Sequence, residues 1–394
     1  MIYRSDPRSG KQLSQLGFGL MRLPRGLTGT DLEKTTAMLE YAVGQGLNYF
    51  DTAYVYPGSE TTFGRALEAS GLRDQLNIAT KLPHQQCRSA ADFDRIFNEQ
   101  LNRLKTDHID YYLIHNLPKA ALWQRLVDIG IKEWIEEKKA SGQIGQIGFS
   151  FHGSQADFLE LLDAYDWEFC QIQYNYLDVN YQAGQLGLKA AYERGLMIVI
   201  MEPLRGGRLA NGLPKKAEEL MQASDRQASY ASWAFRWLFD QAEPTVVLSG
   251  MGSIDQLTDN INTASSFGPG MLSAEQHQLI EDVINIVANN YRINCTGCSY
   301  CMPCPQGVNI PDCFAAYNTY HSQGFIAGVS QYMTGIASPR PDRYSGPTKC
   351  IACGTCEQKC PQGIPIIDSL KEVKQLMEPF WYKPAMAAMK LVMG

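Results

Sequence analysis

Eight cysteines near the C-terminus stand at spacings that suit a metal centre. Thiolates are soft ligands for iron–sulfur clusters and for zinc, and both kinds of site use cysteines separated by two residues. A proline directly after the fourth cysteine favours iron–sulfur clusters, and zinc stays the alternative. The two runs are Cys295-x₂-Cys298-x₂-Cys301-x₂-Cys304-Pro305 and Cys350-x₂-Cys353-x₂-Cys356-x₃-Cys360-Pro361.

The second run has the cysteine spacing of bacterial ferredoxins, and the first is one residue shorter in its last gap. Both runs continue with Gln-Gly, so they form an internal repeat. In ferredoxins with two clusters, the fourth cysteine of each run ligates the other cluster. The resemblance therefore implies two 4Fe–4S clusters, one on Cys295, Cys298, Cys301 and Cys360 and the other on Cys350, Cys353, Cys356 and Cys304. The three remaining cysteines, Cys87, Cys170 and Cys313, are expected to be ordinary thiols.

A second set of chemically active residues stands at the ends of apolar runs in the first half of the chain. It comprises Asp51, Lys81, His115, Ser150 and Gln171, with Tyr56 five residues after Asp51. A lysine cation beside a tyrosine favours the phenolate and lowers the tyrosine pKa from its usual value near 10. An aspartate can hold that lysine charged, and a histidine can hydrogen-bond a substrate oxygen. Such a set suits carbonyl reduction, in which hydride addition leaves an alkoxide that needs a proton.

Strand-like and helix-like segments alternate through the first 265 residues or so. The expected strands are 16–19, 47–51, 76–81, 109–115, 144–149, 168–173, 196–201 and 245–248. The expected helices are 30–46, 59–71, 89–104, 120–141, 154–165, 181–194, 225–239 and 253–264. Eight such units in about 250 residues predict an α/β fold, a (β/α)₈ barrel whose C-terminal strand ends form one rim. An open doubly wound sheet is the alternative, but Gly17-Phe18-Gly19 lacks the third glycine of its nucleotide-binding turn.

The same region resembles the aldo/keto reductase family. Three motifs carry the resemblance: Asp51-Thr52-Ala53-Tyr54-Val55-Tyr56, Ile78-Ala79-Thr80-Lys81 and Asp110-Tyr111-Tyr112-Leu113-Ile114-His115. The resemblance implies a catalytic tetrad of Asp51, Tyr56, Lys81 and His115, with Tyr56 as the acid and base. Tyr54 is expected to line the pocket.

The resemblance also implies a nicotinamide cofactor, NADP or NAD. Ser150 and Gln171 match the residues that grip the nicotinamide carboxamide, and His152 either replaces an asparagine that the family has after this serine or points outward. The segments 202–209 and 249–260 match the pyrophosphate loop and the adenosine end, and the latter contains no Lys or Arg. That absence leaves NADP and NAD open and is also compatible with weak nicotinamide binding. The expected contact residues are Met21, Ser150, Gln171, Pro203, Leu204, Gly207, Gly250, Ser253, Gln256 and Asn260.

Composition narrows the class of protein. The chain has 394 residues, 45% of them hydrophobic, and a formal net charge of −6. The apolar fraction excludes general disorder, and the mild acidity argues against a nucleic-acid binder, which needs a basic face. Neither a secretory signal nor an uninterrupted apolar run long enough to span a membrane is visible. We therefore expect a cytoplasmic protein whose cysteines bind metal and do not form disulfides.

The cysteine distribution divides the chain, because nine of the eleven cysteines lie after residue 294. We expect the barrel over 1–268, a linker helix within 269–294, and a small ferredoxin-like iron–sulfur domain over 295–394. Inside the last domain, helices are expected at 312–320 and 369–377, with an irregular segment at 324–348.

Together these features predict an oxidoreductase. The barrel would transfer hydride between a nicotinamide and a small carbonyl or alcohol, and the clusters would pass single electrons to or from a ferredoxin- or flavodoxin-type partner or serve structure. Flavin normally joins one-electron and hydride steps, and no flavin fingerprint is visible. Two alternatives stay open: a reductase fed by the clusters without nicotinamide, and a redox-sensing or electron-carrier protein with a vestigial barrel.

Overall fold

The computed structural model describes residues 1–26, 29–338, 340, 343–380, 382, 384 and 386. The chain divides into two compact units. The first unit comprises Met1–Pro203 and Ala231–Leu272, and the second comprises Leu204–Tyr230 and Ser273–Gly394. The segment Leu204–Tyr230 thus leaves the first unit after its seventh barrel strand and belongs to the unit that contains the cysteine runs.

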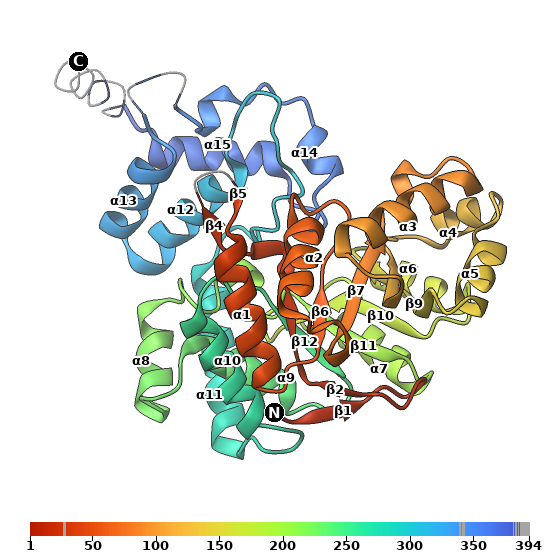
Figure 1. Cartoon of the computed structure of the whole chain (residues 1–394). Helices are drawn as coiled ribbons and strands as arrows, with labels where there is room; N and C mark the ends of the chain where they lie inside the picture. Colours follow the sequence, from red (N-terminus) through yellow and green to blue (C-terminus); the bar gives the residue numbers. More distant parts are fainter. Residues whose placement is uncertain are drawn as a thin grey trace. The chain divides into compact units, whose positions relative to one another are not determined.

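The first unit is a closed barrel of eight parallel strands, which confirms the predicted (β/α)₈ fold (Figure 1). In sequence order, the strands are β3 (Leu16–Gly19), β6 (Tyr49–Asp51), β7 (Asn77–Leu82), β8 (Ile109–Ile114), β9 (Ile144–Phe151), β10 (Phe169–Gln173), β11 (Met197–Met201) and β12 (Val246–Ser249). Strand β3 pairs with both β12 and β6, which closes the barrel.

Large side chains fill the barrel interior, and two glycines make room for them. The interior cluster includes Tyr49, Tyr111, Phe169 and other buried apolar residues of the strands. A Cβ atom on Gly148 of β9 would lie 2.6 Å from the ring of Phe169, and one on Gly17 of β3 would lie 2.7 Å from the side chain of Leu248. Both positions therefore need glycine, because close-packed interiors do not tolerate such overlap.

An antiparallel hairpin of β1 (Tyr3–Ser5) and β2 (Gln12–Ser14) precedes the barrel and contributes Leu13 to the interior cluster. A second, shorter hairpin, β4 (Arg25–Gly26) and β5 (Gly29–Thr30), lies in the loop after β3. Short 3₁₀ turns follow or precede several strands: η1 (Leu20–Arg22), η2 (Arg73–Gln75) and η3 (His84–Gln86).

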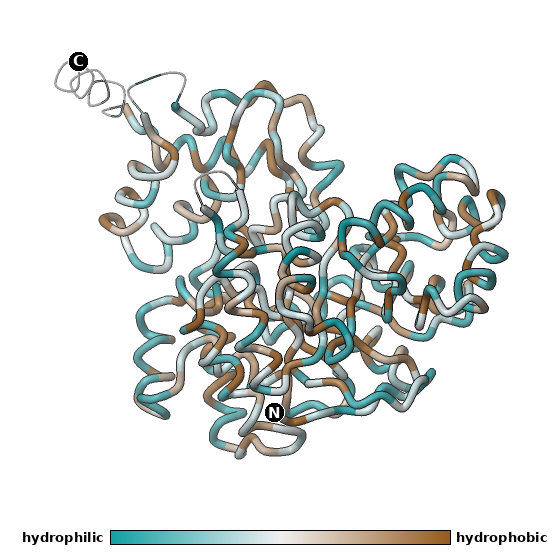
Figure 2. Tube along the Cα trace, in the orientation of Figure 1, coloured by the Kyte–Doolittle hydropathy of each residue, from teal (hydrophilic) through white to brown (hydrophobic). Residues whose placement is uncertain are grey.

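Amphipathic helices surround the barrel, and hydrophilic and hydrophobic residues alternate along them (Figure 2). They are α1 (Leu32–Gly44), α2 (Ser59–Ser70), α3 (Ala90–Leu104), α4 (Ala120–Val127), α5 (Ile131–Ala140), α6 (Gln155–Asp163), α7 (Gly184–Glu193), α9 (Tyr230–Phe239) and α10 (Ile254–Ser266). Asp31, Ser154 and Ser253 cap three of these helices through their side chains. The single helix expected at 120–141 is wrong, because Gly130 adopts a left-handed conformation with φ of 90° and separates α4 from α5.

The regular elements of the second unit, within its described residues, are all helices or 3₁₀ turns. It contains η4 (Arg205–Gly207), α8 (Lys215–Ser224), α11 (Ala274–Asn290), α12 (Ile310–Gln323), α13 (Phe325–Gly335), η5 (Pro347–Lys349), α14 (Thr355–Gln358) and α15 (Ile366–Met377). Helix α8 packs on α11, and α12 packs on α13 and α15. Val308, Phe314, Leu370 and Val373 lie in its core.

Helices α8 and α13 were not expected from the sequence, and α13 contradicts the irregular segment predicted at 324–348. Gly324 turns the chain with φ of 95°, and α13 then packs so closely on α12 that a Cβ atom on Gly328 would lie 2.5 Å from Cα of Tyr320. Tyr332 is 1% exposed in the resulting core. Pro339 and Pro341 of that segment lie outside the described residues.

Over the described part of the chain, no helix combines the length and apolar character that crossing a membrane requires.

Candidate active site and cysteine-lined cavity

The inward-facing side of the barrel strands changes from apolar to polar at their C-terminal ends. Tyr49, Ala79, Leu113 and Phe169 belong to the interior cluster. Side chains alternate along a strand, so the residue two positions further on points to the same side. Those residues are Asp51, Lys81, His115 and Gln171. The barrel therefore gathers them at its C-terminal rim, where barrel enzymes place their active sites.

Lys81 is the centre of this group. Its ammonium group donates hydrogen bonds to Oδ1 and Oδ2 of Asp51 at 2.7 and 2.6 Å and to the carbonyl oxygen of Thr52 at 2.6 Å. Lys81 and Asp51 are 1% and 3% exposed. Burial lowers the pKa of Lys81 and raises that of Asp51, and the ion pair opposes both shifts. A buried ion pair with all donors satisfied holds the lysine in one position.

Tyr56 and His115 complete the group. The ammonium group of Lys81 lies 5.3 Å from the ring centroid of Tyr56, and the rings of Tyr56 and His115 meet edge to face with centroids 6.0 Å apart. Burial and the charges of Lys81, His152 and His84 hold the pKa of His115 well below its usual value. The imidazole is therefore neutral at pH 7 and has one N–H to donate. The structure thus brings all four residues of the predicted tetrad together.

Tyr54 does not line this group, in contrast to the sequence-based expectation. Its hydroxyl donates to Oε2 of Glu99 on α3 at 2.8 Å, and the guanidinium of Arg103 lies 4.2 Å from its ring centroid. Arg103 also bonds the buried carboxylate of Glu60 at 3.0 Å. Tyr54 therefore belongs to an ion-pair network on the helical side of the barrel. Neighbouring side chains of a strand-end loop can point in opposite directions, and Tyr54 and Tyr56 do so here.

Ser150 and Gln171 lie opposite each other on paired strands β9 and β10. The Ser150 hydroxyl oxygen accepts the N–H of Asn116 at 2.8 Å, and the Gln171 amide hydrogen-bonds Asp51. Within the described residues, the buried Oε1 atom of Gln171 has no hydrogen-bond partner. The pair thus presents a hydroxyl proton and a carbonyl oxygen toward the rim.

His152 is 8% exposed, and its Nδ1 atom lies 3.1 Å from Oε1 of Gln182. Burial lowers its pKa to about 4, so the ring is neutral at pH 7. Of the two possibilities that the sequence left open, the outward orientation is wrong.

Of the two segments expected to bind the rest of the dinucleotide, 249–260 lies in the first unit and 202–209 is divided between the two units. Pro203 lies in the first unit, whereas Leu204 and Gly207 lie in the second. Gly250, Ser253, Gln256 and Asn260 surround the start of α10, where Ser253 caps the helix and Oε1 of Gln256 accepts the N–H of Gly252 at 2.9 Å. Asn260 is buried and donates to Oγ of Ser249 at 2.9 Å.

Sequence reasoning missed Arg22 at this helix start. A Cβ atom on Gly250 would lie 3.5 Å from Cδ of Arg22, and one on Gly252 would lie 3.9 Å from the carbonyl oxygen of Arg22. The neighbouring Met21, an expected contact residue, is 50% exposed. The segment 249–260 contains no cation of its own, and Arg22 supplies one from the loop after β3, more than 200 residues earlier in the chain. Its position directly after Met21 was the only available signal.

Four cysteines of the second unit line one small cavity of about 20 Å³. Cys295, Cys298 and Cys301 come from the first run and Cys360 from the second, which is the set that the ferredoxin resemblance implies. Ile310, Phe314, Ile364 and Ile366 form much of the remaining wall. Four thiols around one apolar space fit a multi-iron cluster. No His, Cys, Asp or Glu group of three or more in the described chain is placed to hold a single metal ion.

The other cysteines differ in their surroundings. Cys353 is exposed, and Cys350, Cys356 and Cys304 are half-buried. A Cβ atom on Gly307, in the turn after Cys304, would lie 3.9 Å from Nζ of Lys349, which precedes Cys350. Cys87, Cys170 and Cys313 are buried, and burial raises their pKa values, so these thiols stay protonated.

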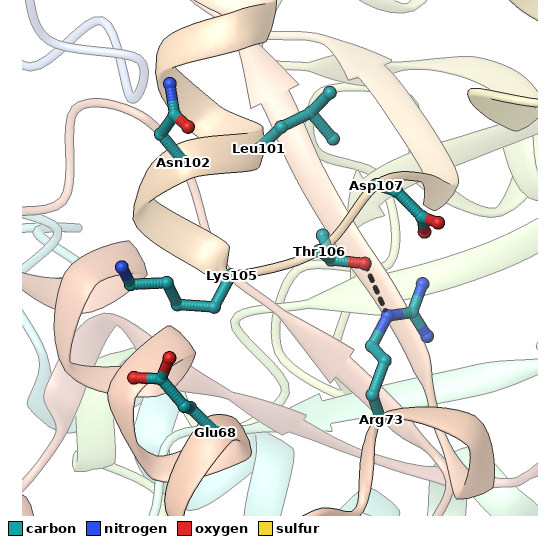
Figure 3. A pocket seen from close by; sticks show the side chains of 7 residues that line it. All are labelled: Glu68, Arg73, Leu101, Asn102, Lys105, Thr106 and Asp107. Carbon is teal, nitrogen blue, oxygen red and sulfur yellow. Dashed lines mark hydrogen bonds between the residues drawn. The ribbon is translucent and has the colours of Figure 1, made fainter.

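A hollow of about 560 Å³ lies away from the tetrad, between the end of α3 and the turns before β7 and β8 (Figure 3). Its Arg73 donates to Oγ1 of Thr106 at 2.8 Å and to Oδ2 of Asp110 at 2.9 Å. The hollow lies at the N-terminal ends of these strands, so it is separate from the catalytic rim. Its lining residues are Glu68, Arg73, Leu101, Asn102, Lys105, Thr106 and Asp107.

Fold and rim geometry define a barrel oxidoreductase, and the comparisons with known proteins agree. The chain belongs to the aldo/keto reductase family, whose model matches residues 15–285. Residues 294–364 match the model of a 4Fe–4S dicluster domain. The protein is therefore an oxidoreductase of this family that carries a 4Fe–4S domain.

Individual relatives align with about two thirds of the chain. An uncharacterized oxidoreductase of Bacillus subtilis, YrpG, is 25% identical and covers 66% of this chain and 90% of its own length. A 6-dehydroglucose reductase of Novosphingobium aromaticivorans is 28% identical and covers 64% and 86%. The holo form of an aldo-keto reductase from Bacillus halodurans is 27% identical, covers 72% and 96%, and has a TM-score of 0.58. An aldo/keto reductase of Klebsiella pneumoniae in complex with NADP and acetate shares the fold, with 22% identity, coverage of 70% and 93%, and a TM-score of 0.56.

Proposed function

We propose that the barrel transfers hydride between NADP(H) and a small carbonyl or alcohol substrate, with Tyr56 as the proton donor and acceptor. The supporting observation is the buried Lys81, whose three donors are engaged by Asp51 and Thr52 while its charge lies 5.3 Å from the ring of Tyr56. The nicotinamide, when bound, supplies the hydride. The phenolic proton of Tyr56 passes to the carbonyl oxygen, and the phenolate that remains is stabilised by Lys81.

His115 would orient the substrate. Its neutral ring can donate an N–H to the carbonyl oxygen and polarise it before the proton arrives. A charged imidazolium would compete with Tyr56 as the acid, and the low pKa of His115 prevents this at pH 7. When an alcohol is oxidised, the phenolate of Tyr56 accepts the hydroxyl proton, and His115 orients the same substrate oxygen.

The rim fits a nicotinamide carboxamide. That group carries one carbonyl oxygen and one NH₂, and Ser150 and Gln171 offer the complement. Ser150 already accepts from Asn116, so its own O–H is available to donate, and the buried Oε1 of Gln171 has no partner in the described part of the chain. An unpaired buried acceptor costs about 1–3 kcal/mol, which binding of the amide would recover.

The decisive experiment compares two neighbouring tyrosines. Tyr56→Phe removes the proposed acid and should lower kcat for carbonyl reduction by about 10²–10⁴-fold, the usual contribution of general acid catalysis. Tyr54→Phe is the matched control, because its hydroxyl is bonded to Glu99, and it should retain turnover. Steady-state kinetics with a panel of aldehydes and ketones provides the measurement. Unchanged turnover in Tyr56→Phe would overturn the assignment.

Arg22 supports NADP(H) over NAD(H), because the 2′-phosphate needs a cation near the start of α10. Arg22→Ala should weaken NADPH binding about tenfold or more while leaving NADH binding nearly unchanged, since a hydrogen bond to a charged group contributes about 1.5–3 kcal/mol. Arg25→Ala removes an exposed cation from the same loop as a control. Fluorescence titration of the full chain measures both affinities. An equal loss for both coenzymes would contradict the 2′-phosphate contact, and no binding of either would favour a reductase fed through the clusters.

For the second unit, we propose two 4Fe–4S clusters with the ligand sets Cys295, Cys298, Cys301, Cys360 and Cys350, Cys353, Cys356, Cys304. The clusters would supply one-electron transfer with a ferredoxin- or flavodoxin-type partner. The cavity lined by cysteines of both runs supports the first set. A reducing cytoplasm is the compartment that suits such thiolate ligands.

A further inference from the structure

A carboxylate is buried on the helical side of the barrel, behind the strand that carries Lys81. Glu60 lies in the first turn of α2 and is 1% exposed. Its Oε1 atom accepts the hydroxyl of Thr80 at 2.7 Å and Nε2 of Gln100 at 2.8 Å, and its Oε2 atom accepts Nη1 of Arg103 at 3.0 Å. Thr80 and Lys81 are neighbours in β7, so their side chains point to opposite sides of the strand. Glu60 therefore lies outside the barrel wall, and the Lys81 ammonium group lies inside it.

The first link from Glu60 reaches the main chain of Lys81. The ladder between β6 and β7 ends at Ala79, whose carbonyl oxygen accepts the N–H of the residue after β6 at 2.8 Å. The Lys81 carbonyl, two residues further along β7, faces the same side but lies beyond the end of β6. The side-chain amide of Gln100 takes the place of a strand partner and donates to this carbonyl at 3.1 Å. The hydroxyl of Tyr112 donates to Oε1 of Gln100 at 2.7 Å and so orients the amide.

The second link reaches the loop that carries Tyr56. Nη1 of Arg103, which bonds Glu60, also donates to the carbonyl oxygen of Tyr54 at 3.2 Å. The carbonyl oxygen of Tyr56 accepts the N–H of Ser59 at 3.1 Å, and Ser59 directly precedes Glu60 at the start of α2. The ion pair and the start of the helix therefore hold the backbone on both sides of Tyr56.

These two links act on the distance between the catalytic groups. A buried polar network whose members are hydrogen-bonded to one another fixes one arrangement of the segments that it joins. Here those segments are β7, with Lys81, and the loop after β6, with Tyr56. The ammonium group of Lys81 lies 5.3 Å from the ring centroid of Tyr56. The attraction between that ammonium and a phenolate falls with distance, so the network affects how far Lys81 lowers the tyrosine pKa.

We propose that Glu60, through Gln100 and Arg103, is a positioning residue that holds Lys81 and Tyr56 at the separation that proton transfer requires. The proposal rests on the proposed hydride transfer with Tyr56 as the acid. Glu60 acts through the backbone carbonyls of Lys81 and Tyr54 and not through contact with the substrate.

A direct effect of the Glu60 charge would have the opposite sign. Burial lowers the pKa of Lys81, and Asp51 and then Glu60 act against that shift. As long as Asp51 keeps Lys81 charged, loss of the Glu60 charge alone would favour the phenolate of Tyr56 and lower its pKa. Movement of Lys81 away from Tyr56 would raise that pKa instead. The direction of the change therefore separates a positional effect from a charge effect.

The experiment measures the pKa of Tyr56 and kcat for carbonyl reduction in two variants of the full chain. Glu60→Gln removes the carboxylate, and Gln100→Met breaks its connection to Lys81 at constant charge. Both should raise the pKa of Tyr56, followed as tyrosinate absorbance in difference titrations against the same protein with Tyr56→Phe. Both should also lower kcat about 10–10²-fold with KM little changed, since small misplacements of catalytic groups have effects of that size.

Glu99→Gln is the matched control. Glu99 also bonds Arg103, at 2.5 Å, but its side chain is 41% exposed. The substitution removes a charge from the same arginine and leaves the bonds of Gln100 intact, so kcat and the pKa of Tyr56 should stay at their wild-type values. Urea unfolding of each variant shows whether it is folded, and Gln100→Met decides alone if Glu60→Gln is not.

Two outcomes would overturn the proposal. A lower pKa of Tyr56 in Glu60→Gln would show that the carboxylate acts by its charge and not by position. A pKa of Tyr56 that stays at its wild-type value in folded Gln100→Met would show that Lys81 does not depend on this network. Failure of the proposed function looks different, because Tyr56→Phe would then retain its turnover.

Discussion

Buried charged side chains link neighbouring segments of the barrel, and Asp110 is an example. Its side chain, 8% exposed, accepts from Arg73 at 2.9 Å, from Lys11 at 3.0 Å and from the N–H of Ile78 at 3.0 Å. Burial alone would raise the pKa of this carboxyl, but Arg73, Ile78 and Lys11 together outweigh it, and the pKa lies below its ordinary value. The carboxylate therefore links the hairpin, the turn before β7 and strand β8.

Asp110→Asn should lower the free energy of unfolding by about 2 kcal/mol at pH 7, since hydrogen bonds to a charged group are lost. A folded-state pKa below the unfolded value near 4 means that the stabilisation is complete above that pH and is lost as pH falls through the folded pKa. The difference between variant and wild type should thus shrink below about pH 4. Urea unfolding followed by tryptophan fluorescence measures it, because five of the six tryptophans lie in the first unit.

The control is Asp166→Asn, which removes an ion pair with Arg8 from a side chain that is 83% exposed. Its effect should stay within about 0.5 kcal/mol at every pH, because exposed pairs are screened. A difference for Asp110→Asn that does not vary with pH would show that packing, and not the charge, is responsible.

At the scale of elements, the packing of two helices can require a residue that is a poor helix former. Gly64 lies in the middle of α2, where alanine would normally be better by about 1 kcal/mol. A Cβ atom there would lie 2.1 Å from the carbonyl oxygen of Arg103 and 2.7 Å from Cα of Leu104, so α2 and the end of α3 would have to separate. Glycine is thus required by the approach of two helices.

Gly64→Ala should therefore destabilise the protein by about 1–3 kcal/mol, the usual cost of overpacking. Gly44→Ala at the end of α1 is the matched control, because nothing lies within 4 Å of its Cβ position, and it should be neutral or stabilising by up to about 1 kcal/mol. Fluorescence-monitored unfolding compares the two variants. Equal stability of both would disprove the close approach.

At the scale of the whole molecule, the two cysteine runs should exchange ligands. Cys356 and Cys360 are only four residues apart in the sequence, yet Cys360 lines the cavity of the first run. Cys356→Ser and Cys360→Ser should damage different clusters, and Cys298→Ser should damage the same one as Cys360→Ser. Cys313→Ser should leave both intact, because this buried thiol does not line the cavity.

Iron and sulfide assays and electron paramagnetic resonance of anaerobically purified variants give the readout. Loss of the same signal from Cys356→Ser and Cys360→Ser would instead show that each run binds its own cluster. Reduced iron in Cys313→Ser would make that residue a ligand after all.

Much of this architecture could be read before any coordinates were known, because the signals are local. Alternating strand and helix patterns specify the barrel, and the tetrad follows from polar residues that end apolar runs, since side-chain alternation keeps Asp51, Lys81 and His115 on the inner side. The cysteine spacing likewise predicts the dicluster domain. The catalytic roles and ligand sets themselves stay predictions.

Other features depend on residues that meet only when the chain folds. Tyr54 joins Glu99 on α3, Arg22 reaches the start of α10, and Arg205 bonds Asn294, in each case across 45 residues or more of sequence. The helix break at Gly130 and the helix α13 were missed for a different reason, because hydrophobic periodicity records neither the left-handed conformation of a glycine nor the close packing of α13 on α12. Periodicity and spacing are properties of a segment, whereas the partner of a side chain in a loop is set by long-range packing, which no local pattern records.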